Sequence, residues 1–154
     1  MELFTTDFLR CALSKIALKL ATFHRVHVGA LDSWPEALTR GDCALMIFNT
    51  EYETQSGEHW VAVYADGYKA YTFDSFPARP FPQHILSRVA KIYDRVESAN
   101  PEGFILQNPL APLCGLYCLA FLLCASHGQT LNLCGNNVVY NDVHVLDVVL
   151  PYIT

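Results

Sequence analysis

Charged residues are scarce in this chain. They make up 16% of its 154 residues, whereas about 25% is usual in soluble domains. Lysine and arginine number 10 against 15 acidic residues, which gives a formal net charge of −5. The chain therefore has no global basic field to draw it onto nucleic acid. Because 52% of its residues are hydrophobic, we expect no disorder, and the length suits one domain over residues 1–154.

Long uncharged apolar runs are also missing. No run reaches the roughly eighteen residues that a membrane span needs, so no membrane partner is expected. The stretch from Met1 to Leu20 mixes Asp7, Arg10 and two lysines with apolar residues, which is typical of an amphipathic helix and not of a signal peptide. We therefore expect an intracellular protein. In a reducing compartment, 6 cysteines indicate thiols, metal ligation or catalysis in preference to a disulfide framework.

A hairpin is predicted between Glu58 and Asp74. Asp66 and Gly67 form the Asp-Gly pair that favours a two-residue turn between two alternating apolar runs. With that turn, His59 lies directly opposite Asp74 on the same face, with Cβ atoms about 5 Å apart. A carboxylate in that position can hold one imidazole nitrogen and leave the other to act as a base. The hairpin therefore predicts a catalytic His59–Asp74 contact.

Hydrophobic periodicity predicts the other elements. The first helix is expected at about 5–21, where apolar residues recur at helical spacing. Further helices are expected at 82–96, at 114–126 and at 142–152, although the valines of the last would also suit a strand. Strands are expected at 43–48 and 103–106, and both faces of the hairpin are expected to be covered. Residues 23–40 are interpreted as a loop.

Cys114 is the candidate nucleophile. It stands at the predicted start of an apolar helix, where unpaired backbone N–H groups favour the thiolate, and Gly115 removes side-chain bulk beside it. A neighbouring imidazolium would favour the thiolate further. Gln107 precedes Cys114 across a loop bounded by prolines, so its amide and the Cys114 N–H are candidate oxyanion donors for acyl transfer.

Less specific interpretations compete for these residues. Trp60 suits core packing, and Asp74 alone could cap a turn. Cys118 and the other four cysteines are expected to be small buried hydrophobic residues. A zinc site requires paired ligands, and the cysteines after Cys114 lack a second paired knuckle. His24 and His27 form a weak metal pattern with no acid beside it. No metal site is predicted.

The ordered set of motifs resembles the adenain family, the adenovirus-type cysteine proteases. The site carries His59-Trp60, then Asp74 in a Phe-Asp-Ser-Phe context, then Gln107 and Cys114 in Gln-x6-Cys-Gly-Leu-x-Cys. Segments outside the site match in the same order and extend the resemblance over about residues 22–142: Val28-Gly29-Ala30-Leu31-Asp32, Ile47-Phe48-Asn49-Thr50, Gly57-Glu58 and Thr130-Leu131-Asn132-Leu133 followed by Gly135.

The resemblance implies a fold, an activity and roles for four residues. The fold is α+β, with a central mixed or mostly antiparallel sheet flanked by helices, related to papain by rearranged chain order. The implied roles are Cys114 as nucleophile, His59 as general base, Asp74 as orienting acid and Gln107 as oxyanion donor. Family members cut viral precursor proteins next to glycine late in particle maturation. The implied partners are precursor polypeptides and an activating peptide, and the implied location is the virion and the host cell nucleus.

Three departures from the family separate what is carried over from what is not. Asp74 stands where adenain has Glu, and the SUMO-specific proteases of the same clan also use Asp. Adenain is activated by a peptide disulfide-linked to a cysteine between its acid and its nucleophile, but no cysteine lies between Cys43 and Cys114 here. Adenain is basic and uses DNA as a cofactor, whereas this chain is acidic. No cofactor is required by the sequence, and these departures disfavour a disulfide-linked peptide and DNA as activators while leaving a peptide or DNA activator open.

Three functions follow from the sequence. The first is an adenain-type cysteine endopeptidase that processes structural precursors of a virus. The second is a processing protease or isopeptidase for a ubiquitin-like protein, including SUMO. The third is a non-enzymatic virion or scaffold protein on a protease fold, which the complete set of four site residues disfavours.

Overall fold

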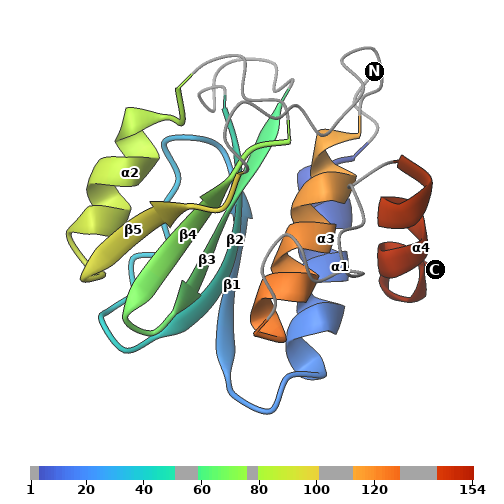
Figure 1. Cartoon of the computed structure of the whole chain (residues 1–154), viewed down its shortest axis with the longest axis horizontal. Helices are drawn as coiled ribbons and strands as arrows, with labels where there is room; N and C mark the ends of the chain where they lie inside the picture. The colour runs from blue at the N-terminus through green and yellow to red at the C-terminus, as the bar shows by residue number, and fades with distance from the viewer. Residues whose placement is uncertain (1–3, 51–58, 76–79, 101–112, 129–141) are drawn as a thin grey trace.

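The computed structural model describes residues 4–50, 59–75, 80–100, 113–128 and 142–154, and its centre is a five-stranded sheet with helices on both faces (Figure 1). The strands follow one another across the sheet in chain order: β1 (His24–Gly29), β2 (Cys43–Asn49), β3 (Trp60–Asp66), β4 (Lys69–Phe73) and β5 (Arg95–Ser98). The two outer pairs are parallel and the two inner pairs are antiparallel. The expected α+β class with a mixed sheet flanked by helices is confirmed.

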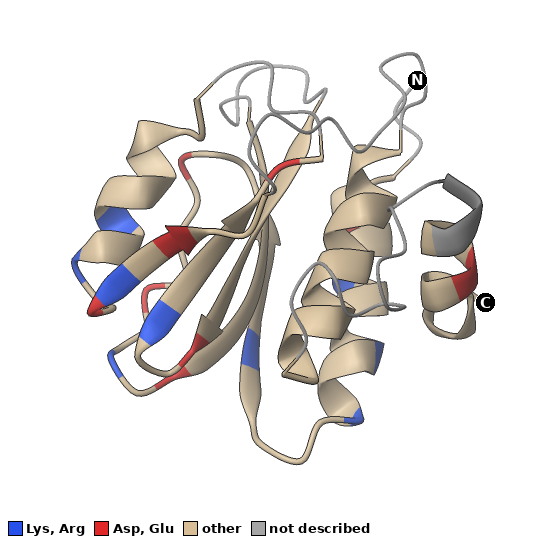
Figure 2. Ribbon diagram, in the orientation of Figure 1, with Lys and Arg blue, Asp and Glu red and all other residues tan. Residues whose placement is uncertain are grey.

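Three helices cover one face of the sheet: α1 (Thr6–Leu18), α3 (Cys114–Ser126) and α4 (Asp142–Ile153) (Figure 1). α1 begins where the sequence encodes a cap, since the Thr5 side chain accepts a hydrogen bond from the Phe8 N–H at 3.1 Å. α3 is apolar all round and packs on β3 as well as against α1 and α4, while α1 packs directly on β1. Figure 2 shows α3 without a charged residue. The helix predicted at 114–126 and the helical interpretation of 142–152 are confirmed.

α2 (Gln83–Ala90) covers the opposite face of the sheet. Its buried residues Ile85 and Val89 pack against alternate side chains of the hairpin, which include Val61 and Val63. The remaining hairpin residues, such as Trp60, pack on the α3 side. A hairpin buried on both faces is what its near-continuous apolar sequence predicts.

Two predicted elements are corrected by the structure. Residues 24–29 form β1 where a loop was expected, because two valines alternating with Arg25 and His27 give a weak strand pattern that becomes stable only by pairing with β2. The helix expected at 82–96 ends at Ala90, and β5 follows. Val96 lies at helical spacing from Ile85 and Val89, but this spacing is a coincidence. Val96 belongs to β5 and packs against the same hydrophobic cluster as the two α2 residues.

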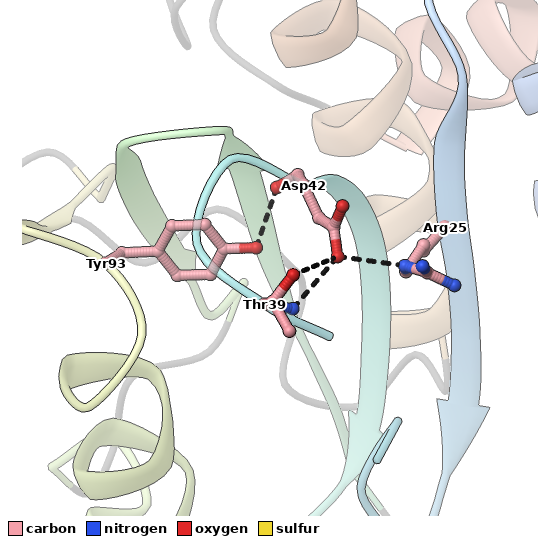
Figure 3. Close-up of polar contacts among 4 residues, drawn as sticks. All are labelled: Arg25, Thr39, Asp42 and Tyr93. Atoms are coloured by element: carbon pink, nitrogen blue, oxygen red, sulfur yellow. Dashed lines mark hydrogen bonds and ion pairs between the residues drawn. The ribbon is translucent and has the colours of Figure 1, made fainter. Parts of the chain in front are cut away.

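Asp42 joins three segments at the end of the sheet where β2 begins (Figure 3). Its carboxylate accepts hydrogen bonds from Arg25 Nε at 3.0 Å and from the Thr39 N–H at 2.9 Å. Its backbone carbonyl accepts a hydrogen bond from the Tyr93 hydroxyl at 2.8 Å. β1, the turn before β2 and the segment after α2 are thereby tied together.

Some predictions fall outside what the structure describes. The strand expected at 103–106 lies in a segment that it does not cover. Among the helices that it does cover, none combines the length and apolarity needed to cross a bilayer.

Candidate active site

His59 and Asp74 lie at the open end of the hairpin. His59 directly precedes β3 and Asp74 directly follows β4, and the His59 Nε2 to Asp74 Oδ1 distance is 2.6 Å. About a quarter of the His59 side chain is exposed and a tenth of the Asp74 side chain. The structure therefore brings together the two residues that the hairpin prediction paired.

The predicted strand register is wrong by two residues. Ala65 pairs with Ala70 and Val63 with Thr72, so the continued register leaves His59 and Asp74 on a diagonal instead of in direct opposition. The turn is longer because the Asp66 carboxylate accepts hydrogen bonds from the N–H groups of Tyr68 and Lys69, at 3.0 and 2.8 Å. An even shift keeps both side chains on one face, whereas a shift of one would have separated them.

The ionisation of His59 reflects burial and two partners. Burial is the largest single influence and lowers its pKa, but the hydrogen bond with Asp74, a hydrogen bond with Cys114 and the charges of both outweigh burial and raise the pKa to about 9. Asp74 occupies Nε2, so Nδ1 is the ring nitrogen that serves the sulfur. Near neutral pH the ring is therefore mostly protonated.

Cys114 is the first residue of α3 and is 5% exposed. The backbone N–H of Trp60 donates a hydrogen bond to its sulfur at 3.3 Å. Leu113, the N-cap residue of α3, makes no side-chain cap hydrogen bond, and the backbone N–H groups of a helix's first turn favour a nearby negative charge. The sulfur thus lies between the imidazole of His59 and two kinds of backbone donor.

Gly115 has a structural role besides the predicted one. A Cβ at this position would lie 3.0 Å from the Cβ of Phe4 and 3.2 Å from a methyl carbon of Leu9. The missing side chain therefore lets the N-terminal segment and α1 approach the start of α3 closely. Gly115 was expected to remove bulk beside the nucleophile, and this packing role is an additional one.

Asn100 is a site residue that the sequence did not indicate. Its Oδ1 accepts a hydrogen bond from the Asp74 N–H at 2.8 Å, and its Nδ2 donates one to the Asp74 carbonyl. No motif distinguishes an asparagine that follows a short strand, so this contact could be found only from the pairing of β4 with β5. Gln107, the predicted oxyanion donor, lies outside the described residues.

The remaining cysteines differ from one another. Cys118 is fully buried, and burial, with Cys114 and Asp74 nearby, raises its pKa well above the ordinary value, so its thiol stays protonated and inert. The expectation of burial is wrong for Cys11, which is exposed on the outer face of α1, and Cys43 is half-buried. Cys124 is disulfide-bonded and is not the free thiol that was expected.

The weak histidine pattern in β1 does not form a metal site. His24 and His27 lie on opposite faces of the strand, as an odd spacing requires. His27 contacts the Ser33 hydroxyl at 2.9 Å, and burial, together with the charge of Arg10, lowers its pKa to about 4. Across the part of the chain that the structure describes, no group of three His, Cys, Asp or Glu side chains is arranged to hold a metal ion.

The fold and the site together define an α+β protein with a cysteine, a histidine and an aspartate in contact. No family model matches the sequence, and no curated protein matches it. Among solved structures, the chain is similar to the crystal structure of selenomethionine ASFV pS273R protease, with 18% identity and a TM-score of 0.46. The match covers 72% of this chain and 42% of that one, so this chain spans less than half of that protein's length. A structural similarity this low says nothing about function. The functional proposal below therefore depends on the geometry of the site.

Proposed function

We propose that this chain is a cysteine endopeptidase in which Cys114, His59 and Asp74 form the catalytic triad. The observation that carries the proposal is the His59 ring, which contacts the Asp74 carboxylate through Nε2 at 2.6 Å and hydrogen-bonds with Cys114. A nucleophile, a base and a residue that orients the base are the parts that acyl transfer requires.

The reaction uses the two nitrogens of His59 differently. The Cys114 thiolate attacks the peptide carbonyl, and protonated Nδ1 of His59 then gives its proton to the leaving amine as the acyl-enzyme forms. Water attacks the acyl-enzyme, His59 takes up a proton from it, and the carboxylic acid product leaves. A His59 pKa of about 9 supports the first step, because the ring carries the required proton at neutral pH.

Stabilisation of the oxyanion is assigned to two donors. The backbone N–H of Cys114 is one, since α3 begins there without a side-chain cap. The side-chain amide of Gln107 is proposed as the other, on the resemblance to the adenain motif alone.

The substrate class follows from the same resemblance. We propose that the chain cleaves structural precursor polypeptides of a virus next to glycine during virion maturation, in the virion and the host cell nucleus. The ordered motifs around His59, Asp74 and Cys114 support this adenain-type assignment. On the edge strand β5 and its neighbour β4, Figure 2 shows basic and acidic residues interspersed, and Glu97 pairs with Arg95 at 2.9 Å and with Lys69 at 4.0 Å. A DNA cofactor draws no support from these paired cations.

One residue favours a second candidate, a processing protease or isopeptidase for a ubiquitin-like protein. Asp74 stands where adenain has Glu and where the SUMO-specific proteases have Asp. Both candidates use the same chemistry and differ in the acyl donor. The two are separated by incubating the protein with a folded ubiquitin-like precursor ending in Gly-Gly and with an unstructured Gly-Gly peptide. Preference for the folded precursor would replace the viral assignment.

The triad is tested by labelling with a thiol-directed peptide electrophile. Cys114→Ala is expected to abolish both labelling and peptide cleavage, because Cys114, among the cysteines that the structure describes, is the one that hydrogen-bonds with His59. Cys118→Ala is the matched control: it removes a thiol one helical turn away that is fully buried and protonated, so both signals should persist. Mass spectrometry of the labelled peptide reads out the site, and labelling that survives Cys114→Ala would overturn the assignment.

A further inference from the structure

The backbone of Asp74 is held on both sides by one side chain. Asn100 Oδ1 accepts from the Asp74 N–H at 2.8 Å, and Asn100 Nδ2 donates to the Asp74 carbonyl oxygen. Asp74 is the donor in the first bond and the acceptor in the second, and both bonds go to the side-chain amide of Asn100. Together they fix the position and the orientation of the Asp74 backbone. This is the pattern by which a neighbouring strand holds its partner.

These bonds extend the sheet beyond the last backbone pair. Thr72 pairs with Ser98 at the end of the parallel β4–β5 ladder, and the Ala99 N–H donates to the Thr72 carbonyl at 2.7 Å. The next residue of that segment is Asn100, whose side chain replaces the missing backbone partner. Asp74 has left β4 but is still held as though it were a strand residue.

Asp74 needs this support because its side chain is short. A single methylene separates its carboxylate from the backbone, so the carboxylate moves with the backbone. The two-residue offset in register also puts His59 diagonally across the hairpin, where Cβ atoms are typically about 7 Å apart in place of about 5 Å. Asp74 and Asn100 both border a hollow between α2 and the ends of β4 and β5. Without the Asn100 side chain, water from this hollow would compete for the Asp74 backbone groups.

We propose that Asn100 is a positioning residue that fixes the backbone of Asp74 so that its carboxylate meets Nε2 of His59. The proposal builds on the proposed function, since it concerns the acid of the same triad. Among the described residues, the side-chain amide of Asn100 hydrogen-bonds to the backbone of Asp74, and Asn100 acts through that residue.

The competing interpretation is that Asn100 merely stabilises the end of β5. Asp66 supplies a matched control at the other end of the same hairpin, because its carboxylate also makes two hydrogen bonds to backbone N–H groups, at 3.0 and 2.8 Å. Asn100→Ala and Asp66→Ala each remove two side-chain-to-backbone bonds from β4 and its flanks. A purely structural role predicts similar consequences for both variants.

The experiment measures the His59 ring directly. Ring proton chemical shifts are followed by NMR through a pH titration, with His59→Gln identifying the resonance. In Asn100→Ala we expect the His59 pKa to fall by about one pH unit, whereas Asp66→Ala should leave it unchanged. The rate of peptide cleavage, which needs the protonated ring, should begin to fall about one pH unit lower in Asn100→Ala alone, whereas at pH 7 the ring stays mostly protonated in both proteins.

The possible outcomes separate the two proposals. An Asn100→Ala titration that matches wild type, or that shifts no more than Asp66→Ala, overturns the positioning role. A wild-type protein that cleaves nothing but whose His59 pKa falls in Asn100→Ala would contradict the protease assignment and leave the positioning role supported. If Asn100→Ala does not fold, Asn100→Ser is titrated in its place and judged by the same comparison.

Discussion

His59 is the residue at which burial and pairing oppose each other. Burial alone would keep the ring neutral, but a carboxylate on one side and a thiol on the other stabilise the protonated form and raise its pKa to about 9. Their combined effect is to keep a proton on the ring at the pH where the enzyme is proposed to work. The state of this residue is therefore a property of three side chains from three elements.

The contribution of Asp74 is tested by Asp74→Asn. We expect the His59 pKa to fall and peptide cleavage to drop by a factor on the order of 10³ to 10⁴, because the ring loses its charged, orienting partner. A raised folded-state pKa stabilises the protein fully below the unfolded value of 6.5 and loses this effect as the pH rises through about 9. The stability advantage of wild type over Asp74→Asn should thus be present at pH 6 and shrink above pH 9, as measured by urea unfolding.

Asp74→Glu is the control, since it keeps the charge and restores the acid found in adenain. It should retain more of the wild-type pH dependence than Asp74→Asn. If wild type, Asp74→Asn and Asp74→Glu showed the same dependence of stability on pH, the pairing of His59 with Asp74 would be contradicted.

The start of α3 is the element on which the site depends most. α3 is buried all round, so its first residue can present a sulfur to His59 only if the helix is fixed along its axis. Gly115 contributes to this by allowing Phe4 and α1 to approach. Sequence patterns predicted both ends of α3, because an uninterrupted apolar run has no alternative to burial. They missed β1 and β5, whose short half-polar sequences acquire strand structure only from their partners.

Gly115→Ala tests the packing at the start of α3. The new Cβ would lie 3.0 Å from the Cβ of Phe4, so α3 and the N-terminal segment must separate. We expect a loss of about 1–2 kcal/mol in the free energy of unfolding, because overpacking outweighs the better helix propensity of alanine. Slower Cys114 alkylation should accompany it, and urea titration with a thiol-labelling assay measures both.

Phe4→Ala supplies the rest of a double-mutant cycle. If Phe4 and the new Cβ oppose each other, Gly115→Ala should cost less in the Phe4→Ala background. Additive free energies would assign the cost of Gly115→Ala to other neighbours.

At the scale of the whole molecule, the candidate site and the Asp42 hydrogen-bond network lie at opposite ends of the sheet. The end where β3 begins and β4 stops carries His59 and Asp74, whereas the other end carries the Asp42 network that ties β1 to the segment after α2 (Figure 3). Hydrogen bonds from Thr39 and Arg25 hold the pKa of Asp42 below its ordinary value. Stability and chemistry should accordingly be separable by mutation.

Asp42→Asn tests that separation. A lowered folded-state pKa stabilises the protein above the unfolded pKa and loses its effect as the pH falls through the folded value. We therefore expect a lower melting temperature than wild type at pH 7 and convergence of the two proteins as the pH is lowered below 4. The rate of Cys114 alkylation per folded molecule should stay unchanged at pH 7, and a reduced rate would mean that the two ends are coupled.

The sequence by itself determined which residues are candidates for the site and that His59 and Asp74 share one face of the hairpin. Alternation in the hairpin assigned His59 and Asp74 to one face, since a side chain's face depends only on whether the register shift is even or odd. The apolar run after Cys114 likewise determined a central helix with the cysteine at its start.

Tertiary structure alone decided the two-residue shift in register, the strands β1 and β5, and the contact of Asn100 with Asp74. The outer strands depend on β2 and β4, and the Asn100 contact depends on parallel pairing across α2, so both need partners distant in the sequence. The shift in register depends on how side-chain-to-backbone hydrogen bonds close the Asp66 turn when the hairpin forms. Local patterns record the preferences of a segment, but hydrogen bonds between distant segments form only when the whole sheet is assembled.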